Sequence, residues 1–261
     1  RCSRDWSSDV CSSDLCDAKD GVTDGVVDDP RQCAFDPATL ICRGADGPGC
    51  LTAEQVDAVK RMYGGARNPR TGAVIYPGWA PTTEALTVNA EGLPTSGWHQ
   101  YWGASEPTRV NFWRAWLFNT TTWDPWTFDF DSHVDLAERT LGPLLDQNSL
   151  DLAAFKGRGG KAIVFQGWQD PVVNAIDTIA YYERLRDRQG SQVATDDFFR
   201  LFLVGGMGHC SGGSGAVSFG NAGERPPVVD TDHDLLMALD ALFAFGVDVD
   251  GLRRFIEGVR I

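Results

Sequence analysis

The chain has 261 residues, of which 43% are hydrophobic, and a formal net charge of −13 at pH 7. That many apolar residues can build a substantial core. The negative charge argues against nucleic acid or an anionic membrane surface as a partner. No apolar run approaches the length of a membrane-spanning helix.

Residues 1–15 do not have the character of a folded segment. Arg4 to Leu15 shows neither helical nor strand periodicity and resembles the translation of a common short-read sequencing adaptor. We therefore expect this stretch to be an artefact and leave it out of the fold. A disordered tail rich in serine and aspartate is the alternative. Cys2 and Cys11 fall inside this stretch and are assigned no chemistry.

The remaining cysteines indicate disulfides. They are Cys16, Cys33, Cys42, Cys50 and Cys210. The first four lie within 35 residues in loop-like sequence, which favours local disulfides and an oxidising compartment, so we expect a secreted or periplasmic protein. Three pairings are possible, and the simplest joins Cys16 to Cys33 and Cys42 to Cys50. A zinc site is the competing interpretation, but there is no paired C-x-x-C and no histidine nearby.

An acidic, glycine-containing loop follows Cys16. Its carboxylates stand three and four positions apart, a spacing of hard oxygen ligands that suits Ca²⁺. The candidate ligands are the side chains of Asp17, Asp20 and Asp24 and the main-chain carbonyls of Val22 and Val26. The loop is not an EF-hand, because counting from Asp20 puts Arg31 at the twelfth position, where a bidentate Glu belongs. A solvated acidic turn explains the composition equally well.

Residues 16–155 have the pattern of an irregular lid. Thr52 and Gln55 form a capping box that starts a helix ending at Gly64-Gly65, and residues 66–95 are rich in turns. Seven of the nine tryptophans follow: Trp79, Trp98, Trp102, Trp113, Trp116, Trp123 and Trp126. Such rings could line a site for an aromatic or sugar-like ligand, or they could form the core of a small subdomain.

Residues 156–261 alternate in the manner of α/β proteins. After a glycine-rich hinge at 156–160, we expect a strand at 161–166 and a helix at 174–188. A second strand is expected at 199–204 and a second helix at 232–245. Two such units cannot form a sheet covered on both faces, so strands are missing. We expect the exposed strand edge and apolar surface to favour aggregation.

Each predicted strand runs into a turn that presents one ionisable side chain. The first turn presents Asp170 and the second presents His209. An acid and then a histidine at successive strand ends is how α/β-hydrolases place the last two members of a Ser, Asp, His triad. Taken singly, Asp170 could be a turn residue before Pro171, and His209 a loop histidine among glycines.

The sequence does not supply the serine. Ser214, in Gly212-Gly-Ser-Gly-Ala216, lacks the final glycine of a G-x-S-x-G elbow, and no strand precedes it. We therefore expect the chain to lack both the nucleophile and the oxyanion hole built around it.

From Cys16 to about Leu242 the motifs resemble those of the tannase and feruloyl esterase family. The resemblance rests on three motifs: the acidic loop, the turn from Gly167 to Val173, and Gly206-Met-Gly-His-Cys210. The resemblance implies an α/β fold: part of an α/β-hydrolase core, formed here by residues 156–261, with a large lid at 16–155 stapled by disulfides and calcium. It also implies a structural Ca²⁺ bound by the acidic-loop ligands named above.

The resemblance also implies roles for individual residues. Asp170 orients His209, and His209 is the general base for a serine. Cys210 pairs with the cysteine directly before that serine, and the family's lid disulfides agree with the two simplest pairings. The family's serine lies in a Gly-x-Cys-Ser-x-Gly-Gly elbow upstream of the acidic loop, which this chain does not reach. We therefore expect Cys210 to be a free thiol here.

Two further departures from the family are visible. Gln166 stands where the family often has His, and we expect it to have no part in the triad. Phe243 to Ile261 loses the family pattern. The expected reaction is hydrolysis of small-molecule esters of aromatic acids, of galloyl, feruloyl or terephthaloyl type. A non-catalytic, calcium-binding, disulfide-stapled module is the alternative.

Overall fold

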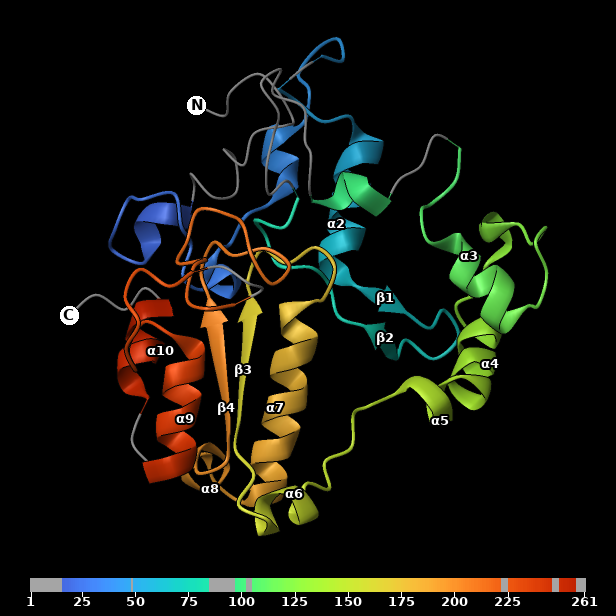
Figure 1. The fold of residues 1–261 in the computed structure, drawn as a ribbon. Coiled ribbons are helices and arrows are strands. Elements are labelled where there is room, and N and C mark those ends of the chain that lie inside the picture. Colours follow the sequence, from blue (N-terminus) through green and yellow to red (C-terminus); the bar gives the residue numbers. More distant parts are fainter. Residues whose placement is uncertain are drawn as a thin grey trace.

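The computed structural model describes residues 16–47, 49–84, 97–101, 105–221, 225–245 and 249–256. Figure 1 shows two long strands side by side in the C-terminal part, with helices flanking them. The N-terminal part extends along one end of this unit and to one side of it. Among the described residues, no helix is long and apolar enough to cross a membrane.

The α-helices are α2 (Ala53–Gly64), α3 (Val110–Phe112), α4 (Ser132–Thr140), α5 (Gly142–Leu145), α6 (Ala153–Gly157), α7 (Ala175–Gln189), α8 (Gln192–Asp196), α9 (Leu235–Phe245) and α10 (Asp250–Ile256). The strands are β1 (Ala66–Arg67), β2 (Val74–Tyr76), β3 (Ala162–Gly167) and β4 (Phe199–Val204). Short 3₁₀ helices are η1 (Asp17–Lys19), η2 (Pro30–Gln32), η3 (Pro37–Leu40), η4 (Trp98–Tyr101) and η6 (Pro125–Thr127), and η5 (Trp113–Leu117) is π-helical.

β3 and β4 form a parallel pair whose register runs from Ala162 opposite Phe199 to Gly167 opposite Val204. Parallel neighbours need a crossover connection, which α7 and α8 supply. β4 has the bounds that the sequence predicts, and β3 begins and ends one residue later than predicted. Because both strands run the same way, their carboxyl ends meet at one edge of the sheet (Figure 1).

Alternation along β4 divides the apolar side chains between two layers. Phe202 and Val204 join a core with α9 and α10, whereas Leu201 and Leu203 pack with Ile179 of α7. Side chains in a strand point alternately to opposite faces, so the two helical layers cover opposite faces of the sheet. The expectation that two such units cannot be covered on both faces was therefore wrong. Figure 1 shows α7 on one side of the strands and α9 and α10 on the other.

The longest helix, α7, is bounded by its own sequence. The Asn174 side chain accepts the N–H of Ile176 at the N-terminus, and Gly190 closes the C-terminus with φ of +86°. Asparagine is a favoured N-cap, and glycine adopts this left-handed conformation without steric cost. These bounds confirm the predicted helix at 174–188 to within a residue.

In the N-terminal part, α2 and the disulfides follow the sequence predictions. Thr52 and Gln55 form the predicted capping box, and α2 ends at Gly64. Disulfides join Cys16 to Cys33, with Cα atoms 5.4 Å apart, and Cys42 to Cys50, with Cα atoms 4.9 Å apart. These are the two pairings expected from nearest-neighbour closure.

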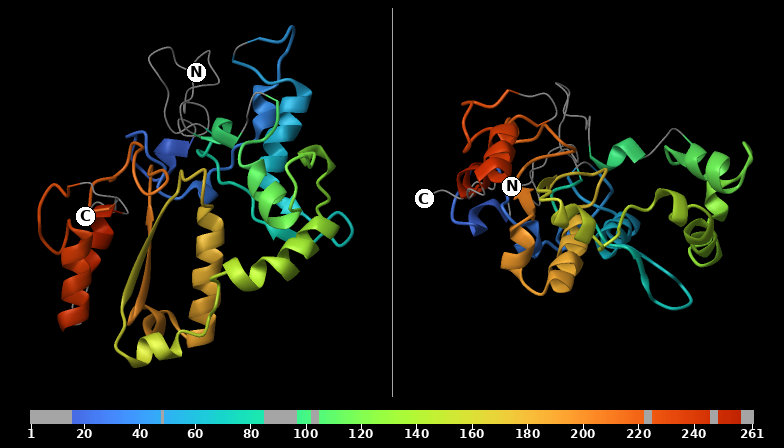
Figure 2. Two further views of the ribbon diagram at one scale, coloured as in Figure 1. Left: turned by 45° about the vertical axis from the view of Figure 1, so that its right-hand side comes forward. Right: turned by 60° about the horizontal axis from the view of Figure 1, so that its bottom comes forward.

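The segment from α3 to α5 lies to the side of the β3–β4 sheet in Figures 1 and 2. A small aromatic cluster holds it together. Phe118 stacks on Trp123 with ring centroids 4.5 Å apart. His133 contacts both of these rings edge-on, and Phe128 contacts Trp123 and His133 edge-on. Trp116 and Trp126 remain 59% and 61% exposed. Aromatic rings therefore serve both as core and as exposed surface.

The chain continues in regular structure beyond Leu242. α9 runs on to Phe245, and α10 places Leu252, which is fully buried, in the same core as Phe202. Residues 232–234, predicted as helix, form a turn before α9 instead. The described residues beyond Leu242 thus include part of the main core.

Candidate functional site

Asp170 lies in the turn between β3 and α7 and is 3% exposed. Its Oδ1 accepts the backbone N–H groups of Val172 at 2.7 Å and Val173 at 3.0 Å. Such an aspartate turn is encoded locally, because the side chain bonds to the backbone two and three residues on. The geometry fixes the carboxylate at the carboxyl end of β3.

His209 lies in the turn that follows β4. The two turns are in direct contact: the N–H of Gln169 donates to Met207 O at 3.0 Å. A Cβ on Gly167 would lie 2.3 Å from that same carbonyl oxygen, so only glycine permits the approach. The glycine at the end of β3 thus brings the two turns close enough for their side chains to meet.

His209 and Asp170 form a hydrogen-bonded pair. The His209 Nδ1 atom is 2.9 Å from Asp170 Oδ2. An ionised carboxylate can only accept, so Nδ1 carries the proton in this contact and Nε2 of the neutral ring is an acceptor. The His209 side chain is 48% exposed, whereas that of Asp170 is 3% exposed. The pair can therefore take up a proton at Nε2 while a buried carboxylate holds the ring.

Gln166, for which the sequence gives no triad role, contacts Asp170. It is 8% exposed, and its Nε2 donates to Asp170 Oδ2 at 3.1 Å. The sequence does not reveal this contact, because it shows only an amide at the end of a strand. The one feature of the sequence that points to Gln166 is its polar side chain within the apolar run of β3.

The backbone around His209 is shaped by its neighbours. Cys210 has φ of +64° and is a free, exposed cysteine, as expected. The buried Asn221 donates from Nδ2 to Cys210 O at 2.7 Å and accepts the Phe219 N–H at Oδ1. Sequence reasoning did not single out Asn221, which holds the carbonyl that directly follows His209.

Ser214 contacts the acidic loop. Its hydroxyl donates to Gly25 O of the acidic loop at 3.1 Å. Within the described residues, no serine hydroxyl is hydrogen-bonded to His209.

The acidic loop is folded around its own backbone. Asp17 Oδ1 accepts the N–H groups of Asp24 and Gly25 at 3.1 and 3.0 Å. Asp20 and Asp24 accept the N–H two residues on, at Val22 and at Val26. In the part of the chain that the structure describes, no three acidic, histidine or cysteine side chains converge as a metal site would require. The three candidate carboxylates, Asp17, Asp20 and Asp24, lie within one loop but do not converge.

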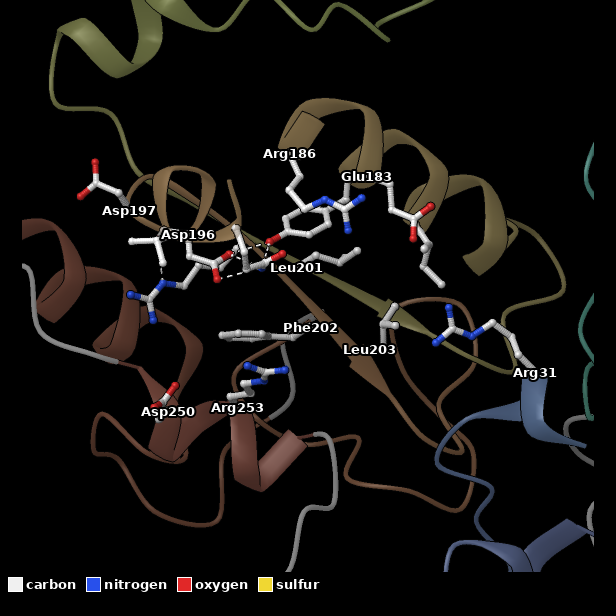
Figure 3. Close-up of a pocket in the computed structure, with 15 residues that line it drawn as sticks. Arg31, Glu183, Arg186, Asp196, Asp197, Leu201, Phe202, Leu203, Asp250 and Arg253 are labelled. Atoms are coloured by element: carbon white, nitrogen blue, oxygen red, sulfur yellow. Dashed lines mark hydrogen bonds between the residues drawn. The ribbon is translucent and has the colours of Figure 1, made fainter. Parts of the chain in front are cut away.

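A cavity of about 520 Å³ lies apart from this pair, against β4 and bordered by α7, α8 and α10 (Figure 3). Four arginines and four carboxylate residues line it. Neither Asp170 nor His209 is among its lining residues. The cavity is therefore separate from the candidate catalytic pair, and its charges balance.

Comparison with known proteins identifies the family of this chain. The family model described as "Tannase and feruloyl esterase" matches residues 10–245. The chain is 38% identical over 252 residues to an uncharacterized esterase of Xanthomonas campestris pv. campestris, covering 89% of this chain and 44% of that protein. It is 37% identical over 242 residues to the mono(2-hydroxyethyl) terephthalate hydrolase of Piscinibacter sakaiensis, covering 78% of this chain and 39% of that protein.

A probable feruloyl esterase B-2 of Aspergillus terreus is 30% identical over 252 residues, covering 93% of this chain and 45% of its own. Among solved structures, feruloyl esterase B of Aspergillus oryzae superposes with a TM-score of 0.75 at 23% identity, covering 93% of this chain and 50% of that one. An esterase of the same organism gives 0.74 at 24% identity, covering 92% and 46%. The chain spans less than half the length of these sequence relatives.

Proposed function

Because the chain belongs to the tannase and feruloyl esterase family, we propose that it is part of a serine carboxylic-ester hydrolase. His209 is its general base, and Asp170 orients that base. The observation that carries the proposal is the contact of His209 Nδ1 with Asp170 Oδ2 at the meeting carboxyl ends of β3 and β4. The reaction is the transfer of an acyl group to water.

In this proposal each side chain of the pair has a defined task. A serine attacks the ester carbonyl and His209 accepts its proton at Nε2, the nitrogen that Asp170 leaves free. Asp170 keeps the ring in the tautomer with a proton on Nδ1 and stabilises the imidazolium that forms. His209 then returns the proton to the leaving alcohol, and water hydrolyses the acyl-enzyme through the same base.

The serine and the oxyanion hole belong, in this proposal, to a part of the protein that the 261 residues do not include. Two observations support this. The hydroxyl of Ser214 is engaged by Gly25 O, and the relatives are more than twice as long as the segment they share with this chain. Residues 16–155 then form the lid, and residues 156–261 the C-terminal part of an α/β-hydrolase core.

The substrate class we propose is a small-molecule ester of an aromatic acid, of galloyl, feruloyl or terephthaloyl type. The names of two relatives, a mono(2-hydroxyethyl) terephthalate hydrolase and a probable feruloyl esterase, support it. So do the exposed rings of Trp116 and Trp126, because flat aromatic surfaces bind aromatic ligands by stacking. The two disulfides support a location outside the cytoplasm, secreted or periplasmic.

We also propose that the acidic loop binds a structural Ca²⁺. The donor chemistry fits, since Asp17, Asp20 and Asp24 offer carboxylate oxygens and the loop adds the carbonyls of Val22 and Val26. In the structure these carboxylates accept backbone N–H groups, so calcium binding requires their side chains to turn toward a common point. The ion would screen their mutual repulsion and would hold the loop rigid.

A fluorophosphonate probe tests the catalytic proposal, because it labels only an activated serine. The 261-residue chain alone should remain unlabelled. A longer protein that includes an upstream Cys-Ser elbow should be labelled and should hydrolyse a feruloyl or terephthaloyl ester. His209→Ala in that longer protein should abolish both. Labelling of any serine within the 261 residues would contradict the proposal, as would an active His209→Ala variant.

A further inference from the structure

The amide of Gln166 stands at the centre of the turn that carries Asp170. Its Nε2 lies 3.1 Å from Asp170 Oδ2, 3.2 Å from Gly167 O and 3.2 Å from Val173 O. Its Oε1 accepts the hydroxyl of Thr178 at 3.1 Å. The opposite amide orientation would place a carbonyl oxygen against three acceptors, so the contacts determine which end donates.

The two oxygens of Asp170 are held in different ways. Oδ1 accepts two backbone N–H groups, from Val172 and Val173. Oδ2 accepts from His209 Nδ1 at 2.9 Å and from Gln166 Nε2 at 3.1 Å. Among the described residues, Gln166 is thus the one donor besides His209 itself that fixes the oxygen facing the imidazole.

From this geometry we propose that Gln166 is a positioning residue for the Asp170–His209 pair. Its amide donates to Oδ2, the oxygen that also accepts from the ring, and so aims that oxygen at the imidazole. The significance for ester hydrolysis rests on the proposed function. The coupling of Gln166 to His209 is a property of this chain and can be measured without a serine.

A purely structural role for Gln166 is the competing explanation. Its contacts to Gly167 O and Val173 O close the turn and would stabilise it whatever Asp170 does. A test must therefore change the contact with Oδ2 and observe His209. A charge introduced at position 166 does so, because it lies beside the carboxylate that faces the ring.

The experiment is a ¹⁵N NMR titration of the His209 ring in the 261-residue chain and in Gln166→Glu. At low pH the introduced carboxyl is neutral and can donate to Oδ2 as the amide does. When it ionises, two negative carboxylates face the ring, and their attraction for a positive charge makes the imidazolium form more favourable. We expect the ratio of imidazolium to imidazole at a given pH to rise about tenfold over wild type, the effect of one nearby charge.

Gln189→Glu, at the end of α7, is the matched control and should titrate as wild type. Gln166→Met is a second variant that keeps the side-chain shape and adds no charge. Losing one hydrogen bond to a charged oxygen should let the Nδ1 proton exchange with water about tenfold faster. Ring titration and proton exchange that match wild type in both Gln166 variants would overturn the proposal. Coupling seen in a protein that hydrolyses no ester would refute only the proposed function.

Discussion

The carboxylate of Asp131 ties the beginning of α4 to the turn between β1 and β2. It accepts hydrogen bonds from Arg70 Nε at 2.7 Å, Arg70 Nη2 at 2.9 Å and Asn68 Nδ2 at 2.6 Å. These hydrogen bonds lower the pKa of Asp131 to about 2, and those from Arg70 contribute more than the one from Asn68. This one side chain therefore connects two segments that the sequence separates by 61 positions.

The lowered pKa of Asp131 predicts an acid-sensitive connection. Its contribution to stability is present above the ordinary pKa of 3.8 and is lost as the pH falls toward the folded-state pKa of about 2. Amide protection of the β1–β2 hairpin should therefore fall over that range. Asp131→Asn should show the lower protection already at pH 6. The control is Asp57→Asn on α2, and equal protection in all three proteins would refute the role of Asp131.

Single residues differ in how well the sequence reveals their roles. Asp170 and His209 could be singled out because each follows an apolar strand and a glycine turn. Gln166 could not, because its partners Asp170 and Thr178 meet it only once β3 and α7 have packed. A side chain at the end of a strand leaves a local pattern, whereas a residue that contacts it depends on the three-dimensional arrangement.

At the scale of elements, α10 completes one face of the sheet. Leu252 is 0% exposed and Val249 is 2% exposed, and both belong to the core that contains Phe202 of β4. A helix of seven residues has little stability of its own. Its position must therefore come from this burial.

Removing the Leu252 side chain tests that packing. Leu252→Ala should lower the free energy of unfolding by about 2–5 kcal/mol, the cost of deleting a fully buried leucine. Leu236→Ala on α9, where the side chain is 68% exposed, is the control and should change stability by less than about 0.5 kcal/mol. Urea denaturation measures both. A neutral Leu252→Ala would show that α10 does not pack on the sheet.

Elements with strong local signals were predicted, and elements formed by packing were not. β3, β4, α2 and α7 have apolar runs, a capping box or terminal glycines, and their bounds agree with prediction to within one or two residues. α5, α8 and α10 have four, five and seven residues, too few for a clear period. The β1–β2 hairpin was not predicted, because residues 66–95 have the composition of turns.

At the scale of the whole molecule, the acidic loop packs on the turn that carries His209. Ser214 Oγ donates to Gly25 O at 3.1 Å, and a Cβ on Gly205 would lie 2.9 Å from Val26 Cγ1. The proposed calcium site and the proposed general base therefore share a contact surface. Stiffening one loop should stiffen the other.

Calcium removal tests this connection. If Ca²⁺ at a hundred times its Kd stabilises the fold by about 2.7 kcal/mol, chelation should lower the Tm by about 5–10 °C. Asp20→Ala should make the Tm insensitive to chelator, while Asp46→Ala, an exposed aspartate outside the loop, should behave as wild type. A Tm of the wild-type chain that chelation leaves unchanged would exclude a structural calcium ion.

The hydrogen bond between Gly25 and Ser214 spans 189 positions of sequence. During synthesis the acidic loop leaves the ribosome long before its partner does, because 189 positions separate the two in the sequence. Contacts between such distant positions form late, because closing a long loop costs entropy before any contact is gained. The turn that holds His209 should therefore be among the last parts of the molecule to reach its final conformation, after α7 and β3 are already in place.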